Sequence, residues 1–408
     1  MDVDRRSVIT GSLAAGLAAA VGSQAASAQS LPNGTPIRCI ALEEHCLPPA
    51  VYEVWGAVGG GGVQKTWRGG GIKERPRGPE FTQDTLGRLR DFEGQRLEDM
   101  DRAGIEMALL SLVVDGPQGQ PDPKAAKDMM VRGNDALAEQ VSKHPDRFAA
   151  FGCLSMHGGD ETNREFERMI NTLGFRGVLL NNWQKVGDGD AILTYDDPRF
   201  DEFWATAAKL EAPVYLHPGY QLSTTTKFFA PYPFGSGTWA WAWETGTHAL
   251  RIMASGVFDR YPKAQMIVGH NGEHVVADLF RLEDRLHGGW RRMKGQPYSN
   301  GYGALPYSAM GKSGRLASPN SSYKAEKTLH SYFRTNVWVA TGGQFNDAGL
   351  RHVIDMVGAD RVMFATDYPY EDMVEAGDWI AGAALSDQER YAIARGNQIK
   401  LFKLPMKT

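Results

Sequence analysis

The feature that most constrains this sequence is a repeated unit, in which a short apolar run is followed by a stretch of helical periodicity. About eight such units occur after residue 36. The apolar runs are continuous rather than alternating, which is typical of parallel strands covered on both faces. We therefore predict a (β/α)8 TIM barrel with loop insertions, and a doubly wound open sheet is the alternative. The predicted strands span residues 37–45, 106–112, 148–156, 177–182, 212–217, 264–270, 336–342 and 361–367.

The composition is that of a large globular domain and excludes several other classes. The chain has 408 residues, of which 42% are hydrophobic, enough for an extensive core. No glycine-rich phosphate motif follows the first apolar run, which weakens the open-sheet alternative. The net charge is −4 with no basic stripe, so we expect no nucleic-acid partner. Cys39, Cys46 and Cys153 suggest neither a disulfide framework nor a zinc knuckle.

Residues 1–28 differ from the rest and resemble a twin-arginine export signal. Arg5-Arg6 precede a weakly apolar stretch of Ala, Gly and Leu, which ends in Ala26-Ser27-Ala28. A membrane anchor is the alternative, but the apolar run is short and rich in Gly and Ala. We expect residues 29–408 to form the mature domain, periplasmic and not embedded in a membrane.

Two segments fall outside the repeated unit. Residues 55–81 are glycine-rich and basic, and residues 291–322 are rich in Gly, Ser and Pro. Both are predicted to be loop insertions between barrel units. Their length is compatible with lids at a substrate site, with oligomer contacts or with solvated loops.

Polar and charged residues gather at the C-terminal ends of the predicted strands. In a parallel barrel all these ends lie on one face, where active sites are built. Three of the ten histidines occupy such positions. The residues concerned are Glu43 and His45, Asn181 and Asn182, His217, His270 with Glu273 close behind, and Asp367.

Two of these residues share the first strand. Alternation along a strand predicts that Glu43 and His45 face the same side and that Glu44 faces the other. Two imidazoles and two carboxylates are a ligand set for one divalent cation such as Zn²⁺ or Mn²⁺. Burial of the carboxylates without a cation or partner would be costly. The alternative is that each residue is a hydrogen-bonded strand terminus. For the whole set together, we favour a metal site over this alternative. The remaining histidines that we assign to structural or solvated positions are His144, His157, His248, His287, His330 and His352.

The segments ALEEH, YLHP, VGHNGE and FATDYPYE resemble the amidohydrolase superfamily. They are most similar to its decarboxylase branch, which includes γ-resorcylate, 2,3-dihydroxybenzoate and 5-carboxyvanillate decarboxylases. The resemblance extends over nearly all of the chain after the export signal, except for most of the two insertions. It implies one divalent metal ion held by Glu43, His45, His217 and Asp367.

The resemblance also implies roles for residues around the metal. His270 is expected close to the metal and substrate, with Glu273 supporting it. The remaining positions are expected to contact the substrate: Arg281 and Arg96 its carboxylate, Tyr370 its ring, and Asn182 the pocket at the end of the fourth strand.

Two further observations concern the substrate and the number of metal ions. The chain has His217-Pro218-Gly219 where relatives often have His-Pro-Arg, so the substrate is not fixed. The fourth strand ends in LLNNW without the lysine of two-metal hydrolases, which favours a single metal.

The expected activity is non-oxidative decarboxylation of a hydroxylated aromatic acid, in which the ring carbon is protonated before carbon dioxide leaves. Asp367 is the expected proton donor, and His270 with Glu273 forms a relay. The alternative is hydrolysis of an ester, lactone or amide by a metal-activated water, and a third possibility is a metal-dependent binding protein without activity. We expect a small aromatic acid as substrate and a homo-oligomer, either a dimer or a tetramer.

Overall fold

The computed structural model describes residues 37–51, 85–113, 116–283, 286 and 324–406. Eight parallel strands form one sheet in the order β1-β2-β3-β4-β7-β8-β9-β10, and a parallel bridge between Leu42 and Ala365 closes it. The sheet is therefore the predicted barrel and not the open-sheet alternative. The strands are β1 (Cys39–Cys46), β2 (Ile105–Leu112), β3 (Phe148–Gly152), β4 (Gly177–Asn181), β7 (Val214–His217), β8 (Met266–Val268), β9 (Val337–Ala340) and β10 (Val362–Met363).

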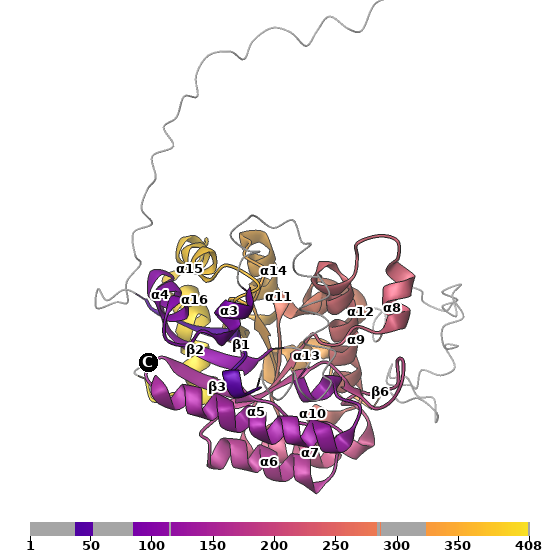
Figure 1. Ribbon diagram of the computed structural model, residues 1–408. Coiled ribbons are helices and arrows are strands. Elements are labelled where there is room, and N and C mark those ends of the chain that lie inside the picture. The colour runs from indigo at the N-terminus through magenta and orange to yellow at the C-terminus, as the bar shows by residue number, and fades with distance from the viewer. Residues whose placement is uncertain (1–36, 52–84, 114–115, 284–285, 287–323, 407–408) are drawn as a thin grey trace, which may run out of the picture.

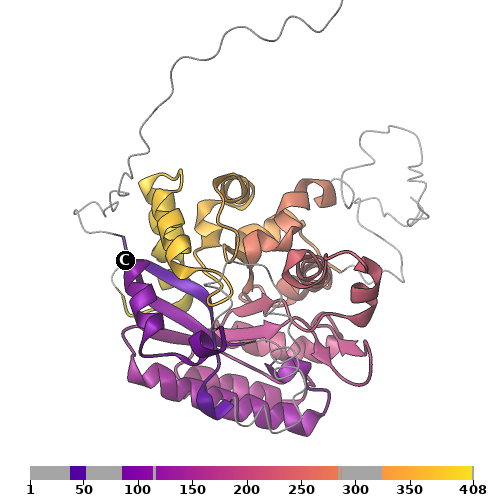
Figure 2. The ribbon, with the colours of Figure 1, turned by 45° about the horizontal axis from the view of Figure 1, so that its top comes forward.

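Helices surround the sheet (Figures 1 and 2). The longest, α5, begins where Asp122 accepts a hydrogen bond from the backbone N–H of Ala125 and Pro123 fills the first turn. The α-helices are α3 (Thr85–Arg90), α4 (Gln95–Arg102), α5 (Pro123–Lys143), α6 (Asp160–Asn171), α7 (Asp201–Leu210), α8 (Ser223–Phe229), α9 (Ala240–Ala254), α10 (Val257–Arg260), α11 (His270–Glu273), α12 (Val275–Glu283), α13 (Leu329–Thr335), α14 (Asp347–Val357), α15 (Met373–Gly382), α16 (Asp387–Tyr391) and α17 (Asn397–Phe402).

Shorter elements complete the connections between barrel units. A small antiparallel pair joins β5 (Gln184–Lys185) to β6 (Ile192–Leu193). The short helical turns are η1 (Gly116–Gly119), η2 (Pro198–Phe200), η3 (Ser236–Thr238), η7 (Ala359–Arg361) and the π-turn η8 (Ala392–Gly396).

The apolar core has two parts, inside and outside the sheet. Along β1, Ile40 and Leu42 belong to the inner cluster, whereas Cys39 and Ala41 pack in the outer cluster beneath the helices. Phe402 of α17 adds to the inner cluster, with its ring 5.4 Å from that of Phe151. Because side chains fill the barrel interior, a site for polar chemistry is left at the ends of the strands.

Several strands are shorter than predicted. The predicted runs 264–270 and 361–367 contain only Met266–Val268 and Val362–Met363 as strand. The chain leaves the sheet before the polar residues, because His270 and Asp367 adopt left-handed backbone conformations (φ 49° and 67°) that a strand does not contain. His270 instead begins α11.

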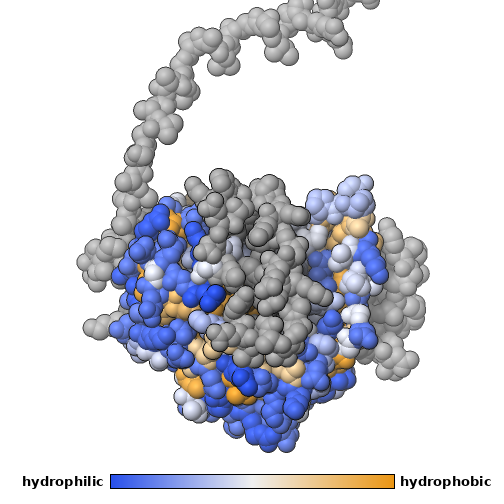
Figure 3. All heavy atoms as spheres, in the orientation of Figure 1, coloured by the Kyte–Doolittle hydropathy of each residue, from blue (hydrophilic) through white to orange (hydrophobic). Residues whose placement is uncertain are grey.

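Other expectations concern parts of the chain that the structure does not describe. The export signal and residues 55–81 and 291–322 lie outside the described residues. Within the described helices, none combines the length and apolar character needed to cross a bilayer. On the face seen in Figure 3, most coloured residues are hydrophilic and apolar ones occur in small groups.

Candidate metal centre and active site

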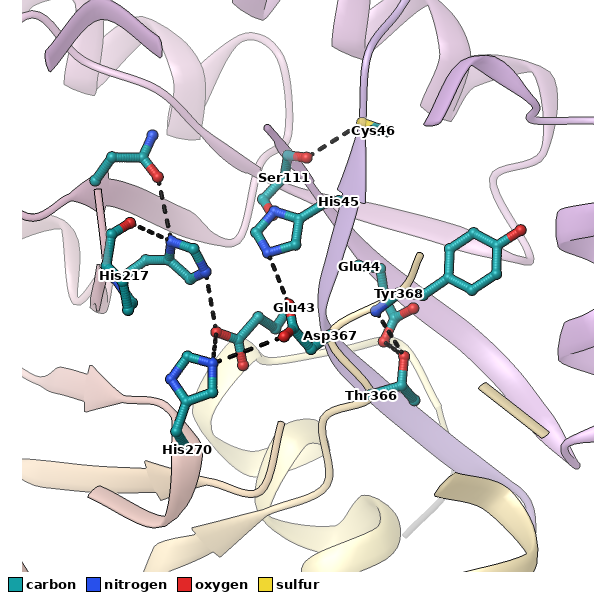
Figure 4. A network of polar contacts seen from close by, with 12 residues as sticks. Glu43, Glu44, His45, Cys46, Ser111, His217, His270, Thr366, Asp367 and Tyr368 are labelled. Atoms are coloured by element: carbon teal, nitrogen blue, oxygen red, sulfur yellow. Dashed lines mark hydrogen bonds and ion pairs between the residues drawn. The ribbon is translucent and has the colours of Figure 1, made fainter. Parts of the chain in front are cut away.

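Four side chains from three parts of the barrel converge on one point (Figure 4). Glu43 and His45 come from β1, His217 ends β7, and Asp367 follows β10. His45 Nε2 lies 3.3 Å from Asp367 Oδ1, and His217 Nε2 lies 3.2 Å from Glu43 Oε1. One donor atom of each residue lies within 4.8 Å of those of the others. The four predicted ligands are thus brought together as one group.

Irregular backbone conformations in β1 set the directions in which Glu43 and His45 point. The register of β1 against β2 shifts between Ala41 and Glu44, and Glu43 has φ 62°. Glu43 and His45 face the centre while Glu44 turns away, accepting a hydrogen bond of 2.7 Å from Thr366 Oγ1. The directions are those that alternation predicts, but an irregular strand produces them. Non-glycine residues in the left-handed region cost roughly 1–3 kcal/mol each and concentrate at functional sites.

Two glycines make room for the carboxylate of Glu43. A Cβ atom at Gly342 would lie 2.2 Å from Glu43 Oε2, and one at Gly269 would lie 3.0 Å from Glu43 Oε1. The first distance is shorter than real Cβ contacts. The second is tighter than most, and the same Cβ atom at Gly269 would lie 2.9 Å from the Tyr215 hydroxyl oxygen. The ends of β8 and β9 therefore form a cradle that only residues without a side chain permit.

A second group of side chains orients the ligands. Ser111 Oγ lies 3.3 Å from His45 Nδ1, and Asn181 Oδ1 lies 3.2 Å from His217 Nδ1. Tyr215 donates a hydrogen bond of 2.8 Å to Glu43 Oε2. These contacts leave Nε2 of both imidazoles and Oε1 of Glu43 for the centre.

Of these orienting residues, Asn181 was noted in the sequence, while Ser111 and Tyr215 were missed. Ser111 is the register partner of His45 on β2, and Tyr215 precedes His217 by two residues on β7. Alternation along β7 was the signal that would have found Tyr215.

His270 and Glu273 form the expected pair beside the ligands. His270 Nδ1 lies 2.6 Å from Glu273 Oε1, and His270 Nε2 lies 3.6 Å from Glu43 Oε1 and 3.8 Å from Asp367 Oδ2. Burial lowers the pKa of His270, but the charges of Glu273 and Glu43 outweigh it and hold that pKa well above its ordinary value.

The electrostatics of the centre call for a cation. Burial raises the pKa values of Glu43 and Asp367, but the neighbouring imidazoles outweigh burial and lower both below their ordinary values. Burial lowers the pKa of His45, which favours its neutral, metal-binding form. Within the described ranges, Glu43 Oε1 and His45 Nε2 are buried without a hydrogen-bond partner. Ionised carboxylates, neutral imidazole and unpartnered donor atoms fit one divalent ion.

Tyr370 is the one predicted substrate contact that lies beside the metal ligands. Its ring centre is 5.5 Å from that of His45. Asn182, in contrast, is buried and accepts a hydrogen bond of 2.9 Å from His248 Nδ1. Its amide therefore supports a buried histidine, whose pKa burial lowers to about 3, and does not face the centre.

The two arginines expected to bind a carboxylate lie elsewhere. Arg281 is exposed on α12 and lines an outer groove with residues of α9 and α13. Arg96 is fully buried on α4 and donates to the backbone carbonyls of His45, Asp91 and Arg88. Within one chain, the structure places Arg281 in this outer groove and Arg96 among backbone carbonyls, and carboxylate binding by either residue stays a prediction. The position of each guanidinium follows from the direction in which α12 and α4 present their side chains.

Comparisons with known proteins agree with this site. A family model described as Amidohydrolase matches residues 49–309 and 314–404. Gamma-resorcylate decarboxylase of Rhizobium sp. (strain MTP-10005) is 34% identical, and the alignment covers 90% of this chain and 98% of that protein. The same enzyme of Rhodococcus jostii (strain RHA1) is also 34% identical, with the same coverage.

Solved structures give the same result. The crystal structure of 2,6-dihydroxybenzoate decarboxylase from Rhizobium is 33% identical with a TM-score of 0.73, covering 90% of this chain and 99% of that chain. A dihydroxybenzoic acid decarboxylase from Polaromonas sp. JS666, with bound manganese and the inhibitor 2-nitroresorcinol, is 31% identical with a TM-score of 0.74. That match covers 91% of this chain and 98% of the other.

Fold and site together define a barrel enzyme with a candidate mononuclear metal centre at the ends of its strands. The chain belongs to the amidohydrolase family, in the branch of the aromatic-acid decarboxylases. The resemblance inferred from the motifs is confirmed, and the enzyme class is carboxy-lyase rather than the hydrolase alternative.

Proposed function

We propose that this protein removes the carboxylate of an aromatic acid that carries a neighbouring hydroxyl group, without oxidation and with one Mn²⁺ ion bound. The observation that carries the proposal is the convergence of Glu43, His45, His217 and Asp367 within 4.8 Å. Its support is similarity to enzymes named for γ-resorcylate and dihydroxybenzoate.

Manganese is proposed over zinc on two grounds. Similar structures of a dihydroxybenzoic acid and a 5-carboxyvanillate decarboxylase hold manganese. The ligand set of this chain is half carboxylate, and carboxylate oxygens suit Mn²⁺ well. When bound, the ion supplies a Lewis acid that attracts the negative oxygen atoms of the substrate.

The residues of the chain then transfer one proton to the substrate. In the overall reaction a carboxylate and a proton become a ring C–H bond and carbon dioxide, and the electrons of the broken C–C bond return to the ring. We assign to Asp367 the delivery of the proton to the ring carbon, with His270 protonating this carboxylate before each turnover. His270 lies 3.8 Å from Asp367 Oδ2 and is held by Glu273 at 2.6 Å, so this pair supplies the replacement proton. Tyr370, whose ring centre is 5.5 Å from that of His45, is assigned the contact with the substrate ring.

We also propose that the protein is a homo-oligomer. Large aromatic side chains are exposed on α8, on the segment after it and at the start of α9, and aromatic residues are enriched at subunit interfaces. Light scattering during size-exclusion chromatography tests this, and a monomeric mass would contradict it. The exposed residues are Phe228, Tyr232, Phe234, Trp239 and Trp243.

Export is a separate proposal that rests on the sequence of residues 1–28 alone. The Arg5-Arg6 pair and the Ala26-Ser27-Ala28 site support a periplasmic mature protein that begins near Gln29. Replacement of both arginines by lysine should leave the precursor in the cytoplasm. Equal periplasmic amounts of the two forms would contradict export by this route.

The activity is tested with the manganese-loaded protein and a panel of hydroxylated benzoates and vanillate-type acids. We expect release of carbon dioxide and, in D₂O, one deuterium in the product at the carbon that carried the carboxylate. Cleavage of esters or lactones without any release of carbon dioxide would overturn the proposal. Elemental analysis should give close to one Mn²⁺ per chain.

A further inference from the structure

The barrel closes along a seam between β1 and β10 that has few backbone contacts. Leu42 and Ala365 form an isolated bridge, flanked by hydrogen bonds of 3.2 Å from Leu42 N to Phe364 O and 3.3 Å from Thr366 N to Leu42 O, and a third bond of 2.8 Å runs from His45 N to Tyr368 O. On the other side of β1, pairing with β2 extends from Cys39 to Cys46. The first strand is therefore held well on one edge and sparsely on the other.

The candidate metal ligands lie on both sides of this seam. His45 belongs to β1, and Asp367 follows β10, yet His45 Nε2 and Asp367 Oδ1 are 3.3 Å apart. Among the described residues, the backbone bond from His45 N to Tyr368 O is the last across the seam, so the relative position of these two donors depends on what holds His45 and Tyr368 in place. A metal ion tolerates only small errors in such a distance.

One guanidinium group touches both sides of the seam. Arg96 Nη2 donates a hydrogen bond of 2.8 Å to the carbonyl oxygen of His45, which is itself a ligand residue. The same guanidinium lies over the ring of Tyr368, 4.6 Å from its centroid, and Tyr368 directly follows the ligand Asp367. Nε donates to Asp91 O at 2.8 Å and so ties the group to the start of α4.

The burial of Arg96 is costly if its purpose is packing alone. Its relative exposure is 0%, and the hydrogen-bond partners of its guanidinium among the described residues are carbonyl oxygens rather than carboxylates. An apolar side chain of similar length would fill the space without the desolvation of a charge. What an apolar side chain lacks is the directed bond to His45 O.

We propose that Arg96 is a positioning residue that braces the seam and fixes His45 relative to Asp367. A second strut supports it, because Thr366 Oγ1 donates 2.7 Å to Glu44 Oε1 between the two ligand-bearing segments. The inference rests on the proposed metal centre, and it assigns to Arg96 a role in metal binding without contact with substrate. The planar guanidinium is required because it bonds at its edge and stacks on its face at the same time.

The test compares Arg96→Lys with a matched control, Arg390→Lys. Arg390 is also buried (3% exposed) and donates only to backbone carbonyls, at Ile380, Ala383 and Leu385. None of these carries a metal ligand. Both variants lose hydrogen bonds from a buried arginine while keeping the charge. A general loss of stability should therefore occur in both, and only a loss specific to Arg96→Lys reports on the metal centre.

The metal-free full chain is titrated with Mn²⁺, and the electron paramagnetic resonance signal of free Mn²⁺ gives the dissociation constant. We expect Arg96→Lys to weaken binding by about 10- to 100-fold, the range typical of residues that orient metal ligands. Arg390→Lys should bind Mn²⁺ like the wild type although its melting temperature falls. Wild-type affinity in Arg96→Lys, or equal weakening in both variants, would overturn the brace.

Two further variants decide the matter if Arg96→Lys does not fold. Thr366→Val removes the second strut without a change of shape, and Tyr368→Leu removes the stacked ring, while Tyr368→Phe keeps it. The Tyr368 hydroxyl has no hydrogen-bond partner among the described residues. We expect weaker Mn²⁺ binding in the first two variants and wild-type binding in Tyr368→Phe. Wild-type affinity in Thr366→Val and Tyr368→Leu would overturn the brace, whereas a wild type that binds no Mn²⁺ would overturn the proposed metal centre itself.

Discussion

The hydroxyl of Tyr215 on β7 donates a hydrogen bond of 2.8 Å to Glu43 Oε2 on β1, across the interior of the barrel. The bond occupies one oxygen of the carboxylate and leaves Oε1, which lies 3.2 Å from His217 Nε2. Because Tyr215 and His217 are two positions apart, they lie on the same face of β7. This strand therefore supplies both a ligand and the group that orients a second ligand. The orientation of Glu43 is therefore set by a residue 172 positions away.

The first prediction is that Tyr215→Phe lowers the affinity for Mn²⁺ by about tenfold. The ring still fills the core, but Glu43 Oε2 loses its donor and the carboxylate is free to turn. Titration of the metal-free variant with Mn²⁺ measures the loss. Tyr391→Phe is the control, since the buried Tyr391 hydroxyl has no hydrogen-bond partner in the part of the chain that the structure describes. Equal affinities in both variants would show that the bond does not orient Glu43.

The ligands themselves could be predicted from the sequence because they depend on topology. Once eight strand–helix units indicate a barrel, the residues at the C-terminal strand ends must converge, whatever their separation along the chain. Topology placed Glu43, His45, His217 and Asp367 among the converging residues, and the resemblance to the amidohydrolase superfamily singled them out as the metal ligands. The left-handed conformations of Glu43, His270 and Asp367 were not predicted, because no local pattern requires them in a residue with a side chain.

The residues around the ligands depend on strand register and on side-chain direction, which a single sequence does not display. Ser111 meets His45 only through the register of β2 against β1. Arg96 occupies a position expected to bind substrate, but α4 directs it beneath the seam of the barrel, where backbone carbonyls receive it. Arg281 faces an outer groove for the same kind of reason. For both arginines, the direction of the side chain was the information that the sequence did not supply.

The second prediction concerns the glycine cradle, where Gly342→Ala should abolish tight Mn²⁺ binding. A Cβ atom at this position would lie 2.2 Å from Glu43 Oε2, so the carboxylate must move away from the centre. Gly382→Ala provides the matched control, because a Cβ atom there has no neighbour within 4 Å. Metal content after dialysis against Mn²⁺ compares the two. Full occupancy in Gly342→Ala would mean that β9 shifts instead of Glu43.

The third prediction is a pH dependence of stability that originates at Glu244. Burial raises the pKa of this carboxyl from its ordinary value of 4.5 to about 7, and one oxygen accepts the backbone N–H of Leu222 at 3.1 Å. Below pH 4.5 the group is protonated in both states. Between pH 4.5 and 7 it ionises first in the unfolded chain, so the free energy of unfolding falls as the pH rises through this window.

Glu244→Gln removes this ionisation and should reverse the loss. We expect the variant to match the wild type near pH 4.5 and to exceed its free energy of unfolding by about 1–3 kcal/mol at pH 8. Melting temperatures across this range measure the difference. Glu139→Gln, on a side chain that is 65% exposed, should follow the wild type at every pH. Parallel curves for wild type and Glu244→Gln would exclude Glu244 as the source.

The last prediction is that Asp367→Asn abolishes turnover while the barrel stays folded. The amide keeps the size of the side chain but cannot carry the proton that the ring carbon receives, and one positioned proton transfer contributes roughly 10²–10⁴ in rate. His270 Nε2, 3.8 Å from Asp367 Oδ2, would then have no carboxylate to reload. Product formation and deuterium uptake from D₂O are measured at saturating Mn²⁺, so that weaker metal binding does not limit the rate. Asp360→Asn, on a side chain that is 62% exposed, should retain wild-type turnover. If Asp367→Asn still introduces deuterium at the carbon that lost the carboxylate, the proton must come from another group, and His270 becomes the donor to test next.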